Sequence, residues 1–260
     1  RNCSPSSDRQ TLARLAEVRH MQVVGYRPVP ESALLLAGGG PVERLTLTAG
    51  TELTHGLGER HCAGTIQNDH HIPCGESRTP YCRRHESQFD ESTLRERTGD
   101  HAVYLAAFAP DVFKVGITRR DRLETRLREQ GADRGAHLQT VPDGDTARDV
   151  EERLGRDLTQ RVRTRWKLAG LGRSVDATAW DELLDEHDPL GTFRFDYGLD
   201  LATQPVHETL ASGIVRGVQG RILVLDRDDT TYAVDMRDLV GHELTDSDER
   251  PLQSSLGSFE

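Results

Sequence analysis

The sequence predicts an α+β fold: a small mixed β-sheet with helices on it, flanked by β-rich N- and C-terminal parts. Short apolar runs broken by Gly or Pro lie toward both ends of the chain, whereas helical patterns gather in the middle. A cysteine- and histidine-rich segment, residues 61–98, precedes the central sheet. The 260 residues are enough to bury a core without disulfide bonds.

The N-terminal β-rich part is expected to cover residues 21–60. In this part MQVVGY, SALLLAG and RLTLTAGTEL have the composition of short strands separated by Pro and Gly. Residues 1–20 precede the first methionine, Met21, and have no comparable pattern. We therefore expect them to form a disordered extension.

The central region, residues 99–175, is predicted to hold two strands followed by two helices. HAVYLAAF and FKVGIT read as strands joined by APDV, and RDRLETRLREQ reads as a helix that ends at Gly131. A Gly- and Asp-rich loop should follow. The second helix is then ARDVEERLGRDLTQRV, with Asp145 or Thr146 as its N-cap.

The C-terminal β-rich part is expected to span residues 190–246. FRFDYGLDL, GIVRGV, GRILVLD and TTYAVDM are its predicted strands, and the acidic tail 247–260 is expected to be unfolded. Neither β-rich part has many strands by itself, so an open alternative is that the two join into one sheet system.

Arginine supplies almost all of the positive charge. Of 33 basic residues only Lys114 and Lys167 are lysines, against 43 acidic residues, a composition that suggests a halophilic archaeon. The net charge of −10 is then better explained by solubility in salt than by the kind of partner the protein binds. The first residues have no apolar signal region, and no run approaches the ~18 apolar residues of a membrane span, so we expect a cytoplasmic protein with no membrane partner.

Three of the four cysteines lie close together. Cys62, Cys74, Cys82 and His85 form a C-x11-C-x7-C-x2-H pattern, and thiolate with imidazole is a ligand set that zinc favours in closed structural sites. The long first spacing leaves room for other ligands, and three more histidines compete for one position: His61, His70 and His71. The alternative is a group of buried free thiols with solvated histidines.

Residues 101–160 resemble the GIY-YIG nuclease superfamily. AVY (102–104) is similar to the first name motif and KVG (114–116) to the second, and Thr118 and Arg126 occupy the places of the family's threonine and helical arginine. The resemblance implies phosphodiester hydrolysis, with Arg126 neutralising developing charge and Tyr104 orienting or deprotonating water. Lys114 stands where the family has tyrosine, and a lysine there could bind phosphate as a point charge.

Glu151 is the candidate for the metal-binding glutamate of that superfamily. At 100° per residue it falls on the apolar stripe of its helix with Val150 and Leu154, whereas Glu152 faces away. A carboxylate on the buried side needs a partner. That partner is either a divalent cation, Mg²⁺ or Mn²⁺, or an arginine such as Arg148 or Arg126.

Over residues 21–245 the chain also resembles an uncharacterised family of unknown function, in which a zinc-binding segment precedes a GIY-YIG-like core. FKVGITR, EQGA, RVRTRWKLAGL and GIVRGVQGRILVLD carry this resemblance. It leaves open a metal-dependent nuclease, a non-catalytic nucleic-acid or ribonucleoprotein-binding protein, and a protein-interaction scaffold.

Residues 161–173 are the predicted nucleic-acid contact, because this stretch has five basic residues and no acid. An indole between cations can stack on a base. The other interpretation is a core tryptophan beside solvated arginines. The candidate contact residues are Arg161, Arg163, Arg165, Trp166 and Lys167.

Overall fold

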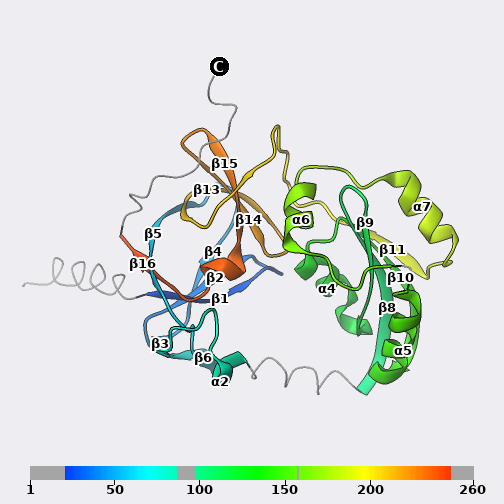
Figure 1. Cartoon of the computed structure of the whole chain (residues 1–260), viewed down its shortest axis with the longest axis horizontal. Helices are drawn as coiled ribbons and strands as arrows, with labels where there is room; N and C mark the ends of the chain where they lie inside the picture. Colours follow the sequence, from blue (N-terminus) through cyan, green and yellow to red (C-terminus); the bar gives the residue numbers. More distant parts are fainter. Residues whose placement is uncertain (1–20, 87–97, 157, 247–260) are drawn as a thin grey trace, which may run out of the picture.

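The computed structural model describes residues 21–86, 98–156 and 158–246, which form two lobes side by side (Figure 1). The first lobe is built on a nine-stranded sheet and the second on a four-stranded sheet, and a small three-stranded sheet lies at the base of the first lobe. The predicted α+β class is confirmed. The predicted N-terminal extension, the acidic tail and residues 87–97 at the end of the cysteine- and histidine-rich segment lie outside the described residues.

The two β-rich parts of the sequence share one sheet, so the alternative of a joint sheet system is confirmed. Its strand order is β12-β15-β14-β13-β5-β16-β1-β2-β4. N-terminal β5 lies between C-terminal β13 and β16 and pairs antiparallel with both. The strands are β1 (Gln22–Arg27), β2 (Ala33–Ala37), β4 (Glu43–Thr46), β5 (Glu52–Arg60), β12 (Val206–His207), β13 (Ala211–Gln219), β14 (Ile222–Arg227), β15 (Thr230–Asp235) and β16 (His242–Thr245).

The nine-stranded sheet folds over a single core. Leu34 on β2 and Val234 on β15 belong to the same buried cluster, although their strands lie near opposite ends of the strand order. Both ends can reach one core only if the sheet bends over itself, which the twist of strands allows. The short helix α8 (Met236–Leu239) adds Met236 and Leu239 to this core.

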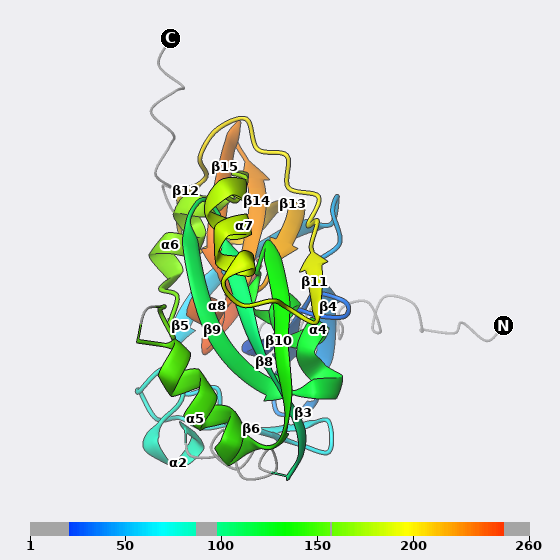
Figure 2. The same ribbon diagram turned by 90° about the vertical axis from the view of Figure 1, so that its right-hand side faces the viewer.

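The second lobe consists of an antiparallel sheet with helices on both faces (Figure 2). Its order is β11-β10-β8-β9, and a parallel bridge joins Lys114 on β9 to Thr159. The sequence predicted a mixed sheet, but every pair of named strands in this sheet is antiparallel. The elements are β8 (Thr98–Phe108), β9 (Val112–Arg119), the 3₁₀ turn η2 (Arg120–Arg122), α4 (Leu123–Gln130), β10 (Arg134–Asp143), α5 (Gly144–Leu154), α6 (Thr164–Gly170), α7 (Ala177–Asp185) and β11 (Gly191–Arg194).

Strand β8 is apolar from Ala102 to Phe108 because both faces of this stretch are covered. Val103 and Leu105 face α5 and α7, whereas Tyr104 and Phe108 face α4. In Figure 2, α5 and α7 lie on the side of the sheet that faces the viewer. The predicted hairpin of β8 and β9 and the helix ending at Gly131, whose φ of 72° is left-handed, are confirmed.

Strand β10 is the main error of the sequence prediction, which placed a loop there. Its sequence, RGAHLQTVPD, has glycine and proline and only weak alternation. The glycine has a packing reason: a Cβ on Gly135 would lie 2.5 Å from the Leu127 side chain of α4. The close approach of α4 to the sheet therefore requires glycine at this position. Glycine is uncommon in strands, so the sequence pattern did not indicate one here.

Two other predicted elements also differ. The N-cap of α5 is Asp143, whose carboxylate accepts from the Thr146 amide at 2.7 Å, rather than Asp145 or Thr146. The predicted strand FRFDYGLDL, assigned to the C-terminal part, is reduced to β11 and pairs with β10 in the second lobe. Its aromatic residues cover the α4 face, and Phe195 is buried there. The remaining boundaries of the predicted domains stay a prediction.

The lobes meet where α4 ends and β13 turns into β14, a contact that we call the lobe junction. Gln219 Nε2 donates to the Gly131 carbonyl and to Asp133 Oδ1, both at 3.0 Å. A Cβ on Gly220 would lie 2.6 Å from the Gly131 amide nitrogen, so the two backbones touch. On β14, Ile222 and Val224 pack toward Leu168 and Leu171 around α6.

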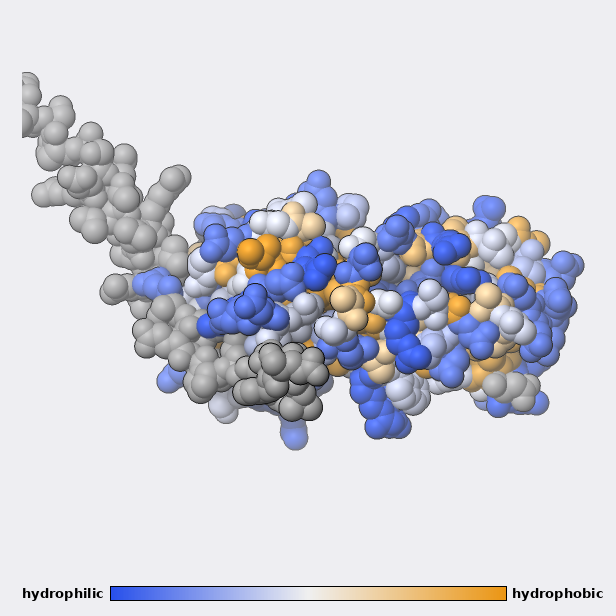
Figure 3. Space-filling model, turned by 90° about the horizontal axis from the view of Figure 1, so that it is seen from above, coloured by the Kyte–Doolittle hydropathy of each residue, from blue (hydrophilic) through white to orange (hydrophobic). Residues whose placement is uncertain are grey.

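Seen from above, hydrophilic side chains cover most of both lobes (Figure 3). Among the helices within residues 21–86, 98–156 and 158–246, none combines the length and apolar character needed to cross a bilayer.

Candidate metal centre and basic cleft

The four residues of the predicted zinc pattern converge on one point. The ligand atoms of Cys62, Cys74, Cys82 and His85 all lie within 4.8 Å of one another. His85 Nδ1 is 3.3 Å from Cys62 Sγ and 3.4 Å from Cys82 Sγ. Ligands around a tetrahedral zinc with bonds of roughly 2.0–2.3 Å are separated by about 3.5 Å, so the donor set and its spacing fit that metal.

Backbone amides are directed at the sulfur atoms. Cys62 Sγ accepts from the amides of Cys82, at 3.2 Å, and Gly64, while Cys82 Sγ accepts from the amides of His85 and Arg84. Such bonds favour the thiolate form that binds metal. Gly64 has a φ of 63°, and a Cβ there would collide with the Ile72 carbonyl oxygen, so this turn requires glycine.

The competing histidines have other partners. His61 contacts the Cys74 carbonyl at 2.9 Å and Glu243 at 3.3 Å, His70 contacts the Asn68 carbonyl at 3.1 Å, and His71 the Ala63 carbonyl at 3.0 Å. His70 and His71 belong to a hairpin of β6 (Thr65–Gln67) and β7 (His70–Ile72), which pairs with β3 (Gly40–Pro41). His85 is supplied by α2 (Arg83–Glu86). The geometry thus favours His85 as the fourth ligand.

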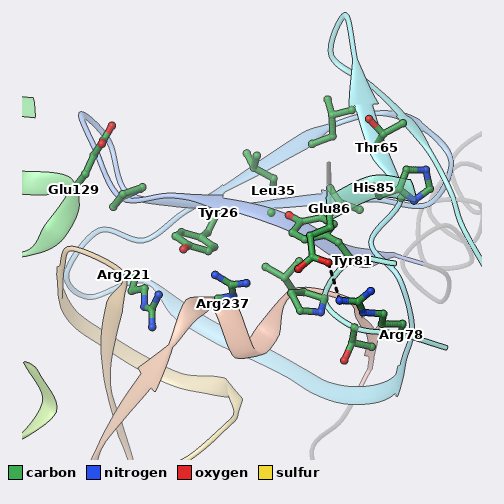
Figure 4. A pocket seen from close by; sticks show the side chains of 18 of the residues that line it. Tyr26, Leu35, Thr65, Arg78, Tyr81, His85, Glu86, Glu129, Arg221 and Arg237 are labelled. Carbon is green, nitrogen blue, oxygen red and sulfur yellow. Dashed lines mark hydrogen bonds and ion pairs between the residues drawn. The ribbon is translucent and has the colours of Figure 1, made fainter. Parts of the chain in front are cut away.

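A cleft of about 1030 Å³ opens beside the candidate metal centre and reaches the second lobe. Its wall combines His85 and the segment around Tyr81 with β1, α8 and the end of α4 (Figure 4). Five cationic side chains and two carboxylates line it, which makes it basic in an acidic protein: Arg78, Arg126, Lys167, Arg221 and Arg237, with Glu86 and Glu129.

Both of those carboxylates are already used in ion pairs. Glu86 binds Arg78 at 2.7 Å, and Glu129 binds Arg126 at 3.3 Å. Lys167 has a neutral partner, since its Nζ donates to the Gln130 carbonyl at 2.6 Å and lies 4.9 Å from the Phe108 ring centroid. Burial, together with Arg221 and Lys114, lowers the pKa of Lys167 to about 8. An arriving anion would favour the charged form of this lysine.

Two of the predicted catalytic side chains, Tyr104 and Lys114, bond to Gln130, which lines the cleft. Gln130 Nε2 donates to the Tyr104 hydroxyl at 2.7 Å, and Lys114 Nζ donates to Gln130 Oε1 at 2.9 Å. Burial lowers the pKa of Lys114 to about 8; Arg126 acts in the same direction and Glu151 opposes it. Tyr104 and Lys114 therefore each lie within electrostatic reach of Arg126 and Glu151.

Tyr104 and Glu151 differ in access to solvent. Tyr104 is 1% exposed, and burial raises the pKa of its hydroxyl, which disfavours deprotonation. Gly116 lies opposite Tyr104 in the hairpin, and a Cβ there would lie 2.6 Å from the hydroxyl oxygen, so the KVG glycine makes room for the ring. Glu151 is half-buried, as its helical position predicted, and burial raises its pKa while Lys114 lowers it.

The predicted nucleic-acid residues separate into two groups. Lys167 lines the cleft, whereas Arg161, Arg163 and Arg165 are exposed outside it. The guanidinium carbons of Arg163 and Arg165 each lie 5.6 Å from the Trp166 ring centroid, which places the half-buried indole between two cations.

The cleft residues that sequence reasoning missed include Tyr26, Gln130, Arg221 and Arg237. Gln130 and Arg221 lie in or beside the EQGA and VQGR stretches, so the unexplained motifs were the available signal for those two. Tyr26 and Arg237 lie in ordinary strand and helix patterns, and only the folding of the sheet brings them together.

Fold and site together define a two-lobed α+β protein with a candidate metal-binding cluster of three cysteines and one histidine beside a basic cleft. Residues 61–244 match the family described as "Protein of unknown function (DUF2797)", and the chain belongs to that family. No curated protein and no solved structure matches the chain.

Proposed function

We propose that the protein binds nucleic acid in the cleft between its lobes and that zinc fills the neighbouring cluster as a structural ion. The observation that carries the proposal is the excess of positive charge in the cleft, where Lys167 has a carbonyl rather than a carboxylate as its partner. Phosphate groups are the polyanion that such a surface attracts. The zinc would fix the segment that forms one wall of the cleft.

Replacing cleft cations is expected to weaken binding. Lys167→Ala and Arg126→Ala should each reduce affinity for labelled DNA and RNA several-fold, because each removes a phosphate contact. Fluorescence anisotropy across a salt series measures this, and the slope of log affinity against log salt should decrease by about 1 per residue.

Arg153→Ala is the control for these variants. Arg153 is an exposed arginine on α5, outside the cleft lining, so its loss changes net charge equally without touching the proposed site. Equal losses for Arg153→Ala and Lys167→Ala would show that binding depends only on total charge, and the cleft would be rejected as the site.

A second candidate function is metal-dependent hydrolysis of phosphodiester bonds. The specific observation in its favour is that Lys114 and Tyr104 each interact electrostatically with Arg126 and Glu151, while Gln130 bonds to both Lys114 and Tyr104. In this mechanism Glu151 would hold a Mg²⁺ or Mn²⁺ ion, Arg126 would stabilise negative charge on the phosphate, and Lys114 would bind a phosphate oxygen. Tyr104, fully buried, would position Gln130 and thereby Lys114.

Glu151→Gln is expected to abolish cleavage and leave binding nearly unchanged, because it removes the metal-binding charge but keeps the side chain's shape. Gel analysis of DNA duplex, single strands and structured RNA with added Mg²⁺ or Mn²⁺ measures this. Glu152→Gln, on the exposed side of the same helix, is the matched control. Bound but uncut substrate across the whole panel would reject catalysis and retain the binding function.

A further inference from the structure

The two sides of the cleft offer different chemistry. On the side of the second lobe the wall is cationic, with Arg126 and Lys167. On the side of the first lobe it includes two tyrosines, Tyr26 of β1 and Tyr81 after the metal-binding segment. Figure 4 shows Tyr26 in one group with Arg221 and Arg237, and Tyr81 farther along the wall beside Glu86 and Arg78.

Tyr26 combines a packed ring with a position among cations. It packs against the core of the first lobe and remains half-buried at the cleft. Burial raises the pKa of Tyr26; Arg221 and Arg237 oppose this effect and Asp235 adds to it. Figure 4 shows both guanidinium groups on the same stretch of the wall as the Tyr26 ring. Arg221 itself is anchored by Asp235, at 2.8 Å. Its guanidinium is therefore fixed beside the ring before any ligand arrives.

Such a pairing of aromatic rings with cations is the surface on which unpaired nucleotides bind, since bases stack on the rings and phosphates contact the cations. In a duplex the base faces are stacked on each other, and proteins reach only the backbone and the groove edges. A duplex would therefore leave the tyrosine side of this cleft without a partner.

The size of the cleft agrees with a ligand of a few unpaired nucleotides. About 1030 Å³ is close to the upper end of small-ligand sites, which span roughly 300–1,000 Å³, and is enough for a short run of nucleotides. The apolar part of the wall, which includes Leu35 and Ile66, could cover the edge of a base.

We propose that the cleft holds an unpaired segment of a nucleic acid strand, with phosphates at Arg126, Lys167 and Arg221 and a base at Tyr26. This inference rests on the proposed nucleic-acid binding and deepens it by naming the single-stranded form. The phosphate and base chemistry is common to DNA and RNA, and the experiment includes both.

Fluorescence anisotropy with labelled oligothymidylate, oligouridylate and a DNA duplex of equal total charge tests the proposal. The single strands should bind more tightly than the duplex. Tyr26→Leu should weaken single-strand binding roughly tenfold, in the range of one lost stacking interaction, and Tyr26→Phe should keep nearly all of the affinity. Lys167→Met should weaken binding of the strands by removing a phosphate contact.

Crosslinking provides a readout on the unsubstituted protein, in case Tyr26→Leu disturbs the core. A strand containing 5-iodouracil should, on irradiation, give adducts on peptides with Tyr26 or Tyr81, as identified by mass spectrometry. Adducts confined to residues 161–166 would overturn the inference. A duplex bound at least as tightly, with no effect of Tyr26→Leu, would also overturn it while leaving nucleic-acid binding intact. Failure to bind any of the three probes would overturn the proposed function itself.

Discussion

Replacing Cys82 with serine is expected to release the metal and to lower the free energy of unfolding by several kcal/mol. Cys82 is buried, and its sulfur lies 3.4 Å from His85 Nδ1 within the four-residue cluster. Because the loops of this segment have little sheet of their own, the energy of metal binding contributes directly to folding. Metal analysis of protein purified without added zinc should find about one zinc ion per chain, and thermal melting measures the loss in the variant.

His70→Ala is the matched control for that experiment. His70 lies in the same segment but is exposed and contacts the Asn68 carbonyl at 3.1 Å. This variant should keep its metal and its melting temperature. Folded protein without zinc, or equal melting of Cys82→Ser and the unsubstituted protein, would contradict a structural zinc.

Gly220→Ala is expected to destabilise the protein by about 2–4 kcal/mol, through crowding and through its left-handed backbone. The added Cβ would lie 2.6 Å from the Gly131 amide nitrogen and 2.8 Å from the Gly131 Cα, so two backbone segments of the lobe junction would have to separate. The φ of Gly220 is +57°, which alanine adopts only with strain. Chemical denaturation measures the free energy of unfolding.

Gly50→Ala separates the two causes. Gly50 has a φ of +87°, and no atom lies within 4 Å of the Cβ that alanine would add there. The Gly50→Ala variant therefore introduces backbone strain without crowding, and its free energy of unfolding should fall by about 1–2 kcal/mol. If Gly220→Ala were no less stable than Gly50→Ala, close contact at the lobe junction would be disproved.

The candidate metal-binding cluster and the β8–β9 hairpin were predictable because their signals are local. The pair Cys82 and His85 has a spacing set by one helical turn, and the apolar run of β8 is continuous in the sequence. The inward position of Glu151 followed from helical periodicity alone, and its half-buried side chain agrees with that prediction.

The cleft was not predictable, because its wall is assembled from segments far apart in the sequence. Tyr26 is close to Arg221 only after β1 and β14 join one folded sheet, and Lys167 reaches Gln130 only through the docking of α6. Strand β10 was not predicted for a related reason. Gly135 is required by its close contact with Leu127, and such a tertiary contact is not visible in the local strand propensity of the sequence.

The central position of β5 affects which part of the chain can fold independently. The family match begins at residue 61, yet β5, which ends at Arg60, separates β13 from β16, and both of these strands lie inside the match except for Thr245. A fragment that starts at residue 61 would leave β13 and β16 with facing rows of unsatisfied amide and carbonyl groups. Open edges of this kind recruit foreign strands and promote aggregation. The cooperative unit is therefore longer than the stretch by which the family is recognised.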